Sequence, residues 1–314
     1  GEIDIKFIGV DEKDTGNAKY LATETPKNYR TPDAFTYDGE ELPGIWVGKF
    51  ETSSSDPNAS DGGGNTISLD PMIKPNVTSW RSITVSNIHT VATKVSAAGN
   101  RYGFSESMNS HAMKNSEWGV VAYLSQSRYG KLGNENFTGA DKEIYQNKSD
   151  SYITGCSYGS PSNANTDYGC QYTYDNNVRD ETGLIGKGVG ASTTGTIYGV
   201  YDMSGGAWEY VMGNYNDTIG SSGFSSMPDA KYYDKYASST ANIACNGDVC
   251  FGHSLSETAG WYSDGQTMIS ATYPWFGRGG YYDNATYAGI FSFNRNTASG
   301  HSNNSFCLVM SATR

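Results

Sequence analysis

The sequence is poor in charged residues, and in basic ones above all. Only 18% of its 314 residues are charged, with 22 Lys and Arg against 33 Asp and Glu, whereas about a quarter is usual in globular proteins. The net charge of −11 disfavours nucleic acids and anionic membrane surfaces as partners, because both select for basic patches. No run of about 18 apolar residues occurs, so the sequence predicts no membrane-spanning helix.

Apolar residues are also scarce, at 37%, and their place is taken by 38 Gly, 24 Tyr and many Ser, Thr and Asn. Aromatic residues still make up 13%, which argues against disorder. We expect a lead-in segment at 1–30 and one α+β domain at 31–314, with two helices, small twisted sheets and long ordered loops. The start at Gly1 reads as a mature or trimmed one, so we expect that any targeting or anchoring segment has been removed.

Five cysteines are present, and their spacing suits disulfides better than a zinc site. Cys245 and Cys250 enclose a turn-forming Asn-Gly and are predicted to form a short bridged loop. Cys156 and Cys170 flank a polar loop and are predicted to form a second bridge. Cys307 is left over in an apolar stretch and is predicted to be a buried thiol. Disulfides favour an extracellular location.

Helical periodicity occurs in two places. An apolar stripe of period 3.6 follows Ser86 and closes at Gly99, and a second predicted helix begins after Asn115 and ends before Gly130. The predicted strands are short, rich in aromatic residues and bounded by Gly, Asn or Ser clusters. They span residues 45–50, 197–201, 208–212, 290–293 and 306–310.

Catalytic motifs are weak throughout. Residues 155–159 match the G-x-S-x-G nucleophile elbow as a string, but Pro161 follows where the elbow needs a helix. Residues 186–190 are rich in glycine but lack the Ser or Thr of a phosphate-binding P-loop. Residues 56–67 lack the glycine and the acid of a calcium loop. The four histidines have no metal-binding spacing, and we expect them to be structural or surface hydrogen-bonders.

Several segments together resemble one known fold family. Tyr198–Tyr210 contains Y-D-M-S-G-G-A-W-E-Y, and residues 275–280 read W-F-G-R-G-G. Residues 44–51, 114–118 and 306–310 match further elements in the same order. The set resembles the formylglycine-generating-enzyme-like branch of the C-type lectin fold, over residues 31–310. The resemblance implies that fold for the whole domain.

Two expectations follow from this resemblance. Glu209 is expected to form a salt bridge with Arg278, to bind an ion, or to be a structural hydrogen-bonder, and the family sometimes holds calcium near here; no cofactor is otherwise implied. The enzymes of the branch use two cysteines close together in the C-terminal part. Here only Cys307 lies beyond Gly252, which argues against oxidase activity.

The stretch 275–305 resembles the variable region of proteins diversified by retroelements, which carry changing residues on a fixed lectin-like scaffold. Ten residues lie between the glycines and phenylalanines of this stretch, at positions that we expect to be exposed. Each of the ten can arise from an AAC codon by changes at adenines alone. With two preceding aromatic residues they form the predicted ligand-binding set: Trp275, Phe276, Tyr281, Tyr282, Asp283, Asn284, Thr286, Tyr287, Ser292, Asn294, Arg295 and Asn296.

Tyr, Asn and Ser are also the residues of adaptable binding loops, where Tyr supplies rigid contact area. The alternative is that these tyrosines pack the domain's own loops. The sequence of residues 118–130 and 201–215 is similar to that of surface proteins of gut Firmicutes that carry a pilin-like helix. We therefore expect a non-enzymatic adhesin, displayed on a bacterial surface or pilus, that binds a protein or glycan of another cell. The alternatives are a phage receptor-binding protein, a formylglycine-generating-type oxidase and a purely structural pilus subunit.

Overall fold

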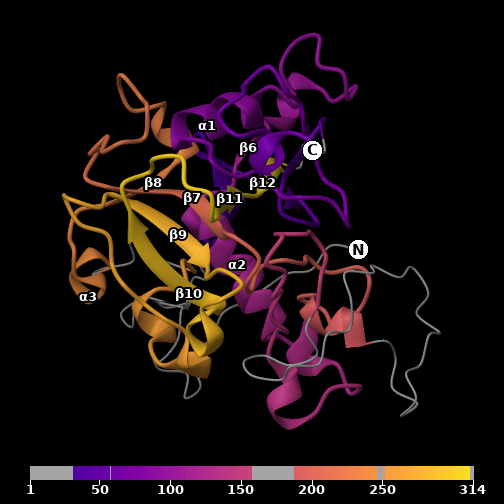
Figure 1. Ribbon diagram of the computed structural model, residues 1–314. Helices are drawn as coiled ribbons and strands as arrows, with labels where there is room; N and C mark the ends of the chain where they lie inside the picture. The colour runs from indigo at the N-terminus through magenta and orange to yellow at the C-terminus, as the bar shows by residue number, and fades with distance from the viewer. Residues whose placement is uncertain (1–30, 57, 158–186, 246–249, 251, 312–314) are drawn as a thin grey trace.

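The computed structural model describes residues 31–56, 58–157, 187–245, 250 and 252–311 (Figure 1). In these ranges the chain forms two helices of more than two turns, a single-turn helix, several small sheets and many short 3-10 helices. The α+β class and the two predicted helices are therefore confirmed. No helix in the described ranges is long and apolar enough to cross a membrane.

The largest sheet has five strands and carries the candidate site. Strands β10, β9, β7 and β11 lie side by side in that order, and β8 pairs with β7 as well. The β10–β9 and β9–β7 pairs are antiparallel, whereas β8 and β11 run parallel to β7. The strand bounds are β7 Trp208–Tyr215, β8 Asp234–Tyr236, β9 Trp275–Gly279, β10 Gly289–Asn296 and β11 Asn304–Phe306.

Three smaller sheets complete the described structure. Strand β12 lies between β3 and β6 and is antiparallel to both, while β1 pairs with β2 and β4 with β5. The bounds are β1 Thr36–Tyr37, β2 Glu40–Glu41, β3 Ile45–Val47, β4 Ser53–Ser54, β5 Pro71–Met72, β6 His111–Ala112 and β12 Leu308–Ser311.

Helix α1 (Val85–Thr93) begins one residue before the predicted cap, after Thr84. Its buried stripe is the one that the period of 3.6 predicts, and the helix packs against β6. Helix α2 (Asn115–Ser125) is buried on almost every side instead of on one face. Gly119 explains part of this, since a Cβ there would lie 2.0 Å from the Gly252 carbonyl oxygen.

Helix α2 contacts both β7 and β10, and in Figure 1 it passes beside the sheet that contains them. The core between them is built from large apolar side chains. Trp118, Phe276 and Phe291 are all fully buried there. This packing holds the sheet rigidly behind the candidate site.

Two predicted strands are corrected. Residues 197–201 do not form a strand: residues 197 and 198 lie in a turn, and Tyr201 N–H donates to Lys49 O instead of to a sheet ladder. Residues 306–310 do not form one strand. The chain changes sheets at Cys307, with β11 on one side and β12 on the other, so a continuous apolar run serves two sheets.

The cysteine predictions have separate outcomes. Cys245 and Cys250 form the predicted disulfide, next to the single-turn helix α3 (Ala241–Ala244). Cys307 is a free and buried thiol, as predicted. The predicted Cys156–Cys170 bridge involves a residue outside the described ranges.

Candidate functional site

The 281–287 loop leaves the sheet through a glycine turn between β9 and β10. Gly279 and Gly280 have φ values of +82° and +74°, which glycine adopts without strain. Gly279 is the register partner of Gly289, so the loop departs and returns at one point. A Cβ on Gly280 would lie 2.6 Å from the Cα of Ala288. The glycine pair therefore lets the chain leave β9 without strain.

The loop is fixed by its own hydrogen bonds. Tyr281 N–H donates to the Asn284 side-chain Oδ1 at 2.9 Å, and Asn284 N–H donates back to Tyr281 O at 2.9 Å. Tyr287 N–H then donates to Asn284 O at 3.0 Å, within the 3-10 helix η11 (Ala285–Tyr287). Asn284 is therefore a structural residue of the loop as well as a predicted binding residue.

Two bonds tie this loop to its neighbours. Tyr282 N–H donates to Gly206 O at 2.9 Å, and Gly265 N–H donates to Tyr287 O at 3.0 Å. The loop is thus held on both sides, and its side chains are presented from a defined backbone.

Exposure is uneven along the loop. Tyr287 is 66% exposed, Asp283 is also exposed, and Tyr281, Tyr282 and Asn284 are partly buried, as is Thr286. Tyr281 and Tyr282 meet edge to face at 5.4 Å, and Tyr282 meets Tyr152 in the same way at 5.3 Å. The alternative of tyrosines packing the domain's own loops therefore holds in part for this pair.

Arg81 lies beneath these rings. Its guanidinium carbon is 3.9 Å from the ring centre of Tyr152, a cation–π contact with little access to water. Arg81 also pairs with Asp61 at 3.3 Å. The row of rings from Tyr152 to Tyr281 is thus fixed at its inner end by a buried cation.

Two aromatic residues extend the exposed surface and were missed by the sequence argument. Trp261 and Tyr262, in the 3-10 helix η10 (Trp261–Ser263), are 40% and 37% exposed. Both rings contact the buried Phe291, at 5.0 Å and 6.1 Å, and η10 contacts η11. The available signal was an aromatic pair in a polar Gly/Ser/Asp loop. We call the following set the aromatic face: Trp261, Tyr262, Tyr281, Tyr282, Asp283, Asn284, Thr286 and Tyr287.

The last three predicted residues lie elsewhere. Asn294, Arg295 and Asn296 pair with the start of β9, at the opposite end of β10 from the loop. At about 3.4 Å per residue, five residues of strand separate them from the loop by roughly 17 Å. Arg295 lies over the ring of Tyr273, 5.1 Å from its centre. Asn296 is structural, since its Oδ1 accepts from the Tyr210 hydroxyl at 2.7 Å.

Three predicted binding residues are buried. Trp275 and Phe276 are both 0% exposed and belong to the core, and Ser292 is buried with its hydroxyl donating to Gly265 O at 3.0 Å. Strand β9 is covered on both faces, so its aromatic side chains pack inward. These residues support the sheet and do not reach a ligand at the surface.

The salt bridge with Arg278, one of the three roles considered for Glu209, does not form, although the two residues are cross-strand partners. The Arg278 guanidinium donates instead to Asn115 Oδ1 at 2.7 Å, His253 O at 2.7 Å and Ser254 O at 3.0 Å. Burial lowers the pKa of Arg278 to about 10. Arg278 therefore joins β9 to α2 and to the 253–254 turn.

Glu209 belongs to a buried acidic group with Glu51 and Asp202. Glu51 Oε1 accepts from Ala207 N–H at 2.8 Å, and Asp202 Oδ1 accepts from Asn147 Nδ2 at 2.9 Å. Burial raises the pKa of all three, that of Asp202 to about 6. Among the described side chains, no group of three His, Cys, Asp or Glu residues is arranged to hold a metal ion.

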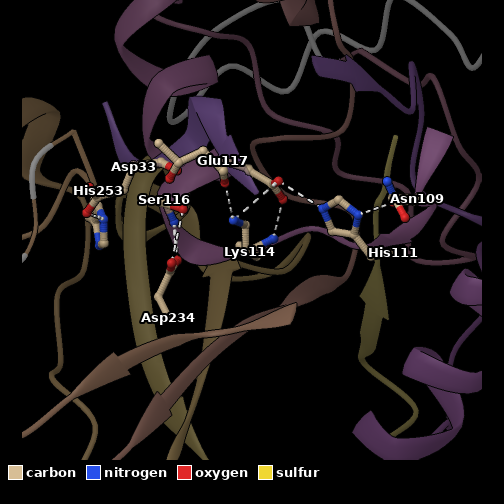
Figure 2. Close-up of polar contacts among 9 residues, drawn as sticks. Asp33, Asn109, His111, Lys114, Ser116, Glu117, Asp234 and His253 are labelled. Carbon is tan, nitrogen blue, oxygen red and sulfur yellow. Dashed lines mark hydrogen bonds and ion pairs between the residues drawn. The ribbon is translucent and has the colours of Figure 1, made fainter. Parts of the chain in front are cut away.

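Figure 2 shows the polar network at the start of α2, which contains two of the four histidines. His111 lies between Asn109 O at 2.6 Å and Glu117 Oε1 at 2.9 Å. Glu117 Oε2 also accepts from Lys114 N–H at 2.7 Å and so caps the helix. These contacts fit the structural role expected for His111.

The second histidine of this network is His253. Its Nε2 is 2.8 Å from Asp33 Oδ2, and its Nδ1 is 2.7 Å from the Tyr236 hydroxyl. Asp234 accepts from the Ser116 backbone and hydroxyl at 2.6 and 3.2 Å (Figure 2). Both ring nitrogens of His253 are thus engaged, which fits the structural role expected for it.

The chain matches no model of a known protein family, and a search of curated proteins finds no significant relative.

Proposed function

We propose that the protein is a non-enzymatic ligand-binding protein and that the aromatic face is its binding surface. One observation carries the proposal: a loop with exposed aromatic and polar side chains is held at both ends on a rigid sheet. Such a loop combines large contact area with a low entropy cost of binding. Trp and Tyr are also the residues that most often dominate binding energy.

The proposed fold is the formylglycine-generating-enzyme-like branch of the C-type lectin fold. Its support is the order of the motifs and their use in the core, where Trp118 and Met203 are buried. Gly205 and Gly206 have positive φ values and turn the chain into β7. We further propose surface or pilus display, with a phage receptor-binding protein as the variant.

The non-enzymatic assignment is supported by the state of Cys307. Burial and the neighbouring Glu209 raise the pKa of this thiol well above its usual value. The reactive form of cysteine is the thiolate, which such an environment disfavours. A test is incubation with copper and a cysteine-containing peptide: we expect no oxidation, and turnover abolished by Cys307→Ala would favour the oxidase.

Capture experiments test the binding surface. The probes are a glycan array and intact bacterial cells, with Tyr287→Ala and Trp261→Ala as variants and Tyr198→Ala as a matched control. Tyr198 is 80% exposed but lies on another loop. We expect each face variant to lower capture at least tenfold and the control to leave it unchanged. Unchanged capture by both face variants would reject the aromatic face.

The gene itself tests the diversification proposal. A diversified gene is expected to have a near-copy of the 275–305 coding region beside it, together with a reverse transcriptase. Close relatives are expected to differ at the exposed loop positions and to agree at Gly279 and Gly280. Equal variation along the whole chain would favour a purely structural subunit.

A further inference from the structure

An apolar groove lies on the three-stranded sheet of β3, β12 and β6, away from the aromatic face. We call this sheet the small sheet. The volume of the groove is about 720 Å³, and its walls include Val47, Ile73, Met108 and Met310. Trp46 lies at this groove and is 61% exposed. Exposed apolar surfaces of this kind usually mark a place where another segment or molecule binds.

The groove adjoins an open sheet edge. Strand β3 pairs only with β12 within the described ranges. Gly48 N–H donates to Leu308 O at 2.8 Å. Because hydrogen-bonding pairs alternate along an antiparallel ladder, the backbone groups of Ile45 and Val47 point away from β12. An unpaired edge beside an apolar groove is the arrangement that accepts an added strand.

The chain itself contains a segment with the matching pattern. Residues 2–8 read Glu-Ile-Asp-Ile-Lys-Phe-Ile, in which polar residues alternate with Ile3, Ile5 and Phe7. This period of two is that of a strand with one apolar face. The segment lies outside the ranges that the structure describes.

The segment can also reach the groove. Residues 9–30 connect it to Thr31, and a chain of this length spans up to about 70 Å when extended. A chain of 314 residues has a radius of gyration of about 20 Å, so the tether exceeds the width of the domain. At the groove, Lys74 has no acidic partner among the described residues, and the segment carries Glu2 and Asp4.

We propose that residues 2–8 add to the free edge of β3 as a strand and cover the groove with Ile3, Ile5 and Phe7. The backbone groups of Ile45 and Val47 then become hydrogen-bonded, and Trp46 becomes covered. The small sheet gains a fourth strand, which removes an edge that otherwise favours aggregation.

Amide hydrogen exchange of the full chain tests this directly. We expect the Ile45 and Val47 amides to be protected at least tenfold over their unprotected rates. The variant Ile3→Ser, Ile5→Ser, Phe7→Ser is expected to lose this protection and to bind the dye anilinonaphthalene sulfonate more strongly. The control variant Lys6→Ser changes only the opposite face and is expected to keep both properties of the unaltered chain.

Three results would overturn the proposal. The first is exchange of the Ile45 and Val47 amides at unprotected rates in the unaltered chain. The second is equal behaviour of the two variants. The third is protection that rises with protein concentration together with a dimer mass in solution, which would assign the groove to a second copy. Near-ultraviolet circular dichroism checks that each variant keeps its core.

Discussion

Gly280 lies directly against Ala288, and this contact closes the base of the 281–287 loop. A Cβ on Gly280 would lie 2.6 Å from the Ala288 Cα and 2.7 Å from its Cβ, at a φ of +74°. The position thus combines a backbone conformation that favours glycine with a contact that leaves no room for a side chain. The loop keeps its shape because its two ends touch.

Gly280→Ala is therefore expected to destabilise the fold and displace the loop. The positive φ costs about 1 kcal/mol, and forced overpacking adds about 1–3 kcal/mol. Gly39→Ala is the control, because Gly39 has a φ of +83° with nothing within 4 Å of a Cβ. Urea unfolding measures both. Equal losses would mean that the contact with Ala288 has no energetic weight.

The sequence predicted both helices, since these depend on local chemistry. It failed where burial depends on tertiary neighbours. Trp275 and Phe276 have the composition of a binding loop, yet β9 lies between β7 and β10 and both side chains are buried. Residue type alone does not separate an exposed aromatic from a core one.

The same limit explains the division of the predicted site. The twelve predicted residues are close in sequence, but the extended β10 carries Asn294 and Arg295 far from the loop. A long connection brings Trp261 against Phe291, and no periodicity in the sequence predicts this contact. The salt bridge considered for Glu209 and Arg278 does not form, because the Arg278 guanidinium donates to Asn115 and to two carbonyl groups instead.

Asp264, behind the aromatic face, predicts that the stability of the fold depends on pH. Burial raises its pKa to about 8, although its Oδ2 accepts from Phe291 N–H at 2.9 Å. Between pH 4 and pH 8 the unfolded chain has lost the proton that the folded chain keeps, so this group lowers stability as the pH rises. The loss is complete above the folded pKa.

Asp264→Asn is expected to remove that slope. Relative to the unaltered chain, the variant's free energy of unfolding should rise by at least about 1 kcal/mol between pH 5 and pH 8. Urea titrations at the two pH values measure the difference, and other buried acids cancel because both chains contain them. Parallel curves for the two proteins would show that Asp264 is ionised in the folded state.

The buried pair of His111 and Glu117 predicts a pH dependence of stability with the opposite sign to that of Asp264. Both side chains are 1% exposed, and the His111 ring nitrogens lie 2.6 Å from Asn109 O and 2.9 Å from Glu117 Oε1. Burial favours a higher pKa for Glu117, but His111 and Lys114 outweigh it and the pKa is lowered. This stabilisation is present above about pH 4.5 and is lost as the pH falls through the folded pKa.

Glu117→Gln is expected to cost about 3 kcal/mol at pH 7, because it removes the buried carboxylate that contacts His111 and Lys114. It should also flatten the acid limb of the stability curve. Glu106→Gln, at an exposed position in a 3-10 helix, is the control and should change stability by less than about 0.5 kcal/mol. A full loss at pH 7 with an unchanged acid limb would assign the effect to packing alone.

The last prediction concerns how freely the face can change. Asp283, Thr286 and Tyr287 contribute little to the core, so replacing all three by Ser should change the free energy of unfolding by no more than about 1 kcal/mol. Phe291 is fully buried beneath Trp261, and Phe291→Ala should cost about 3–5 kcal/mol. Thermal and urea unfolding give both values. A triple variant as unstable as Phe291→Ala would mean that the loop residues support the fold, and a surface of that kind is not free to diversify.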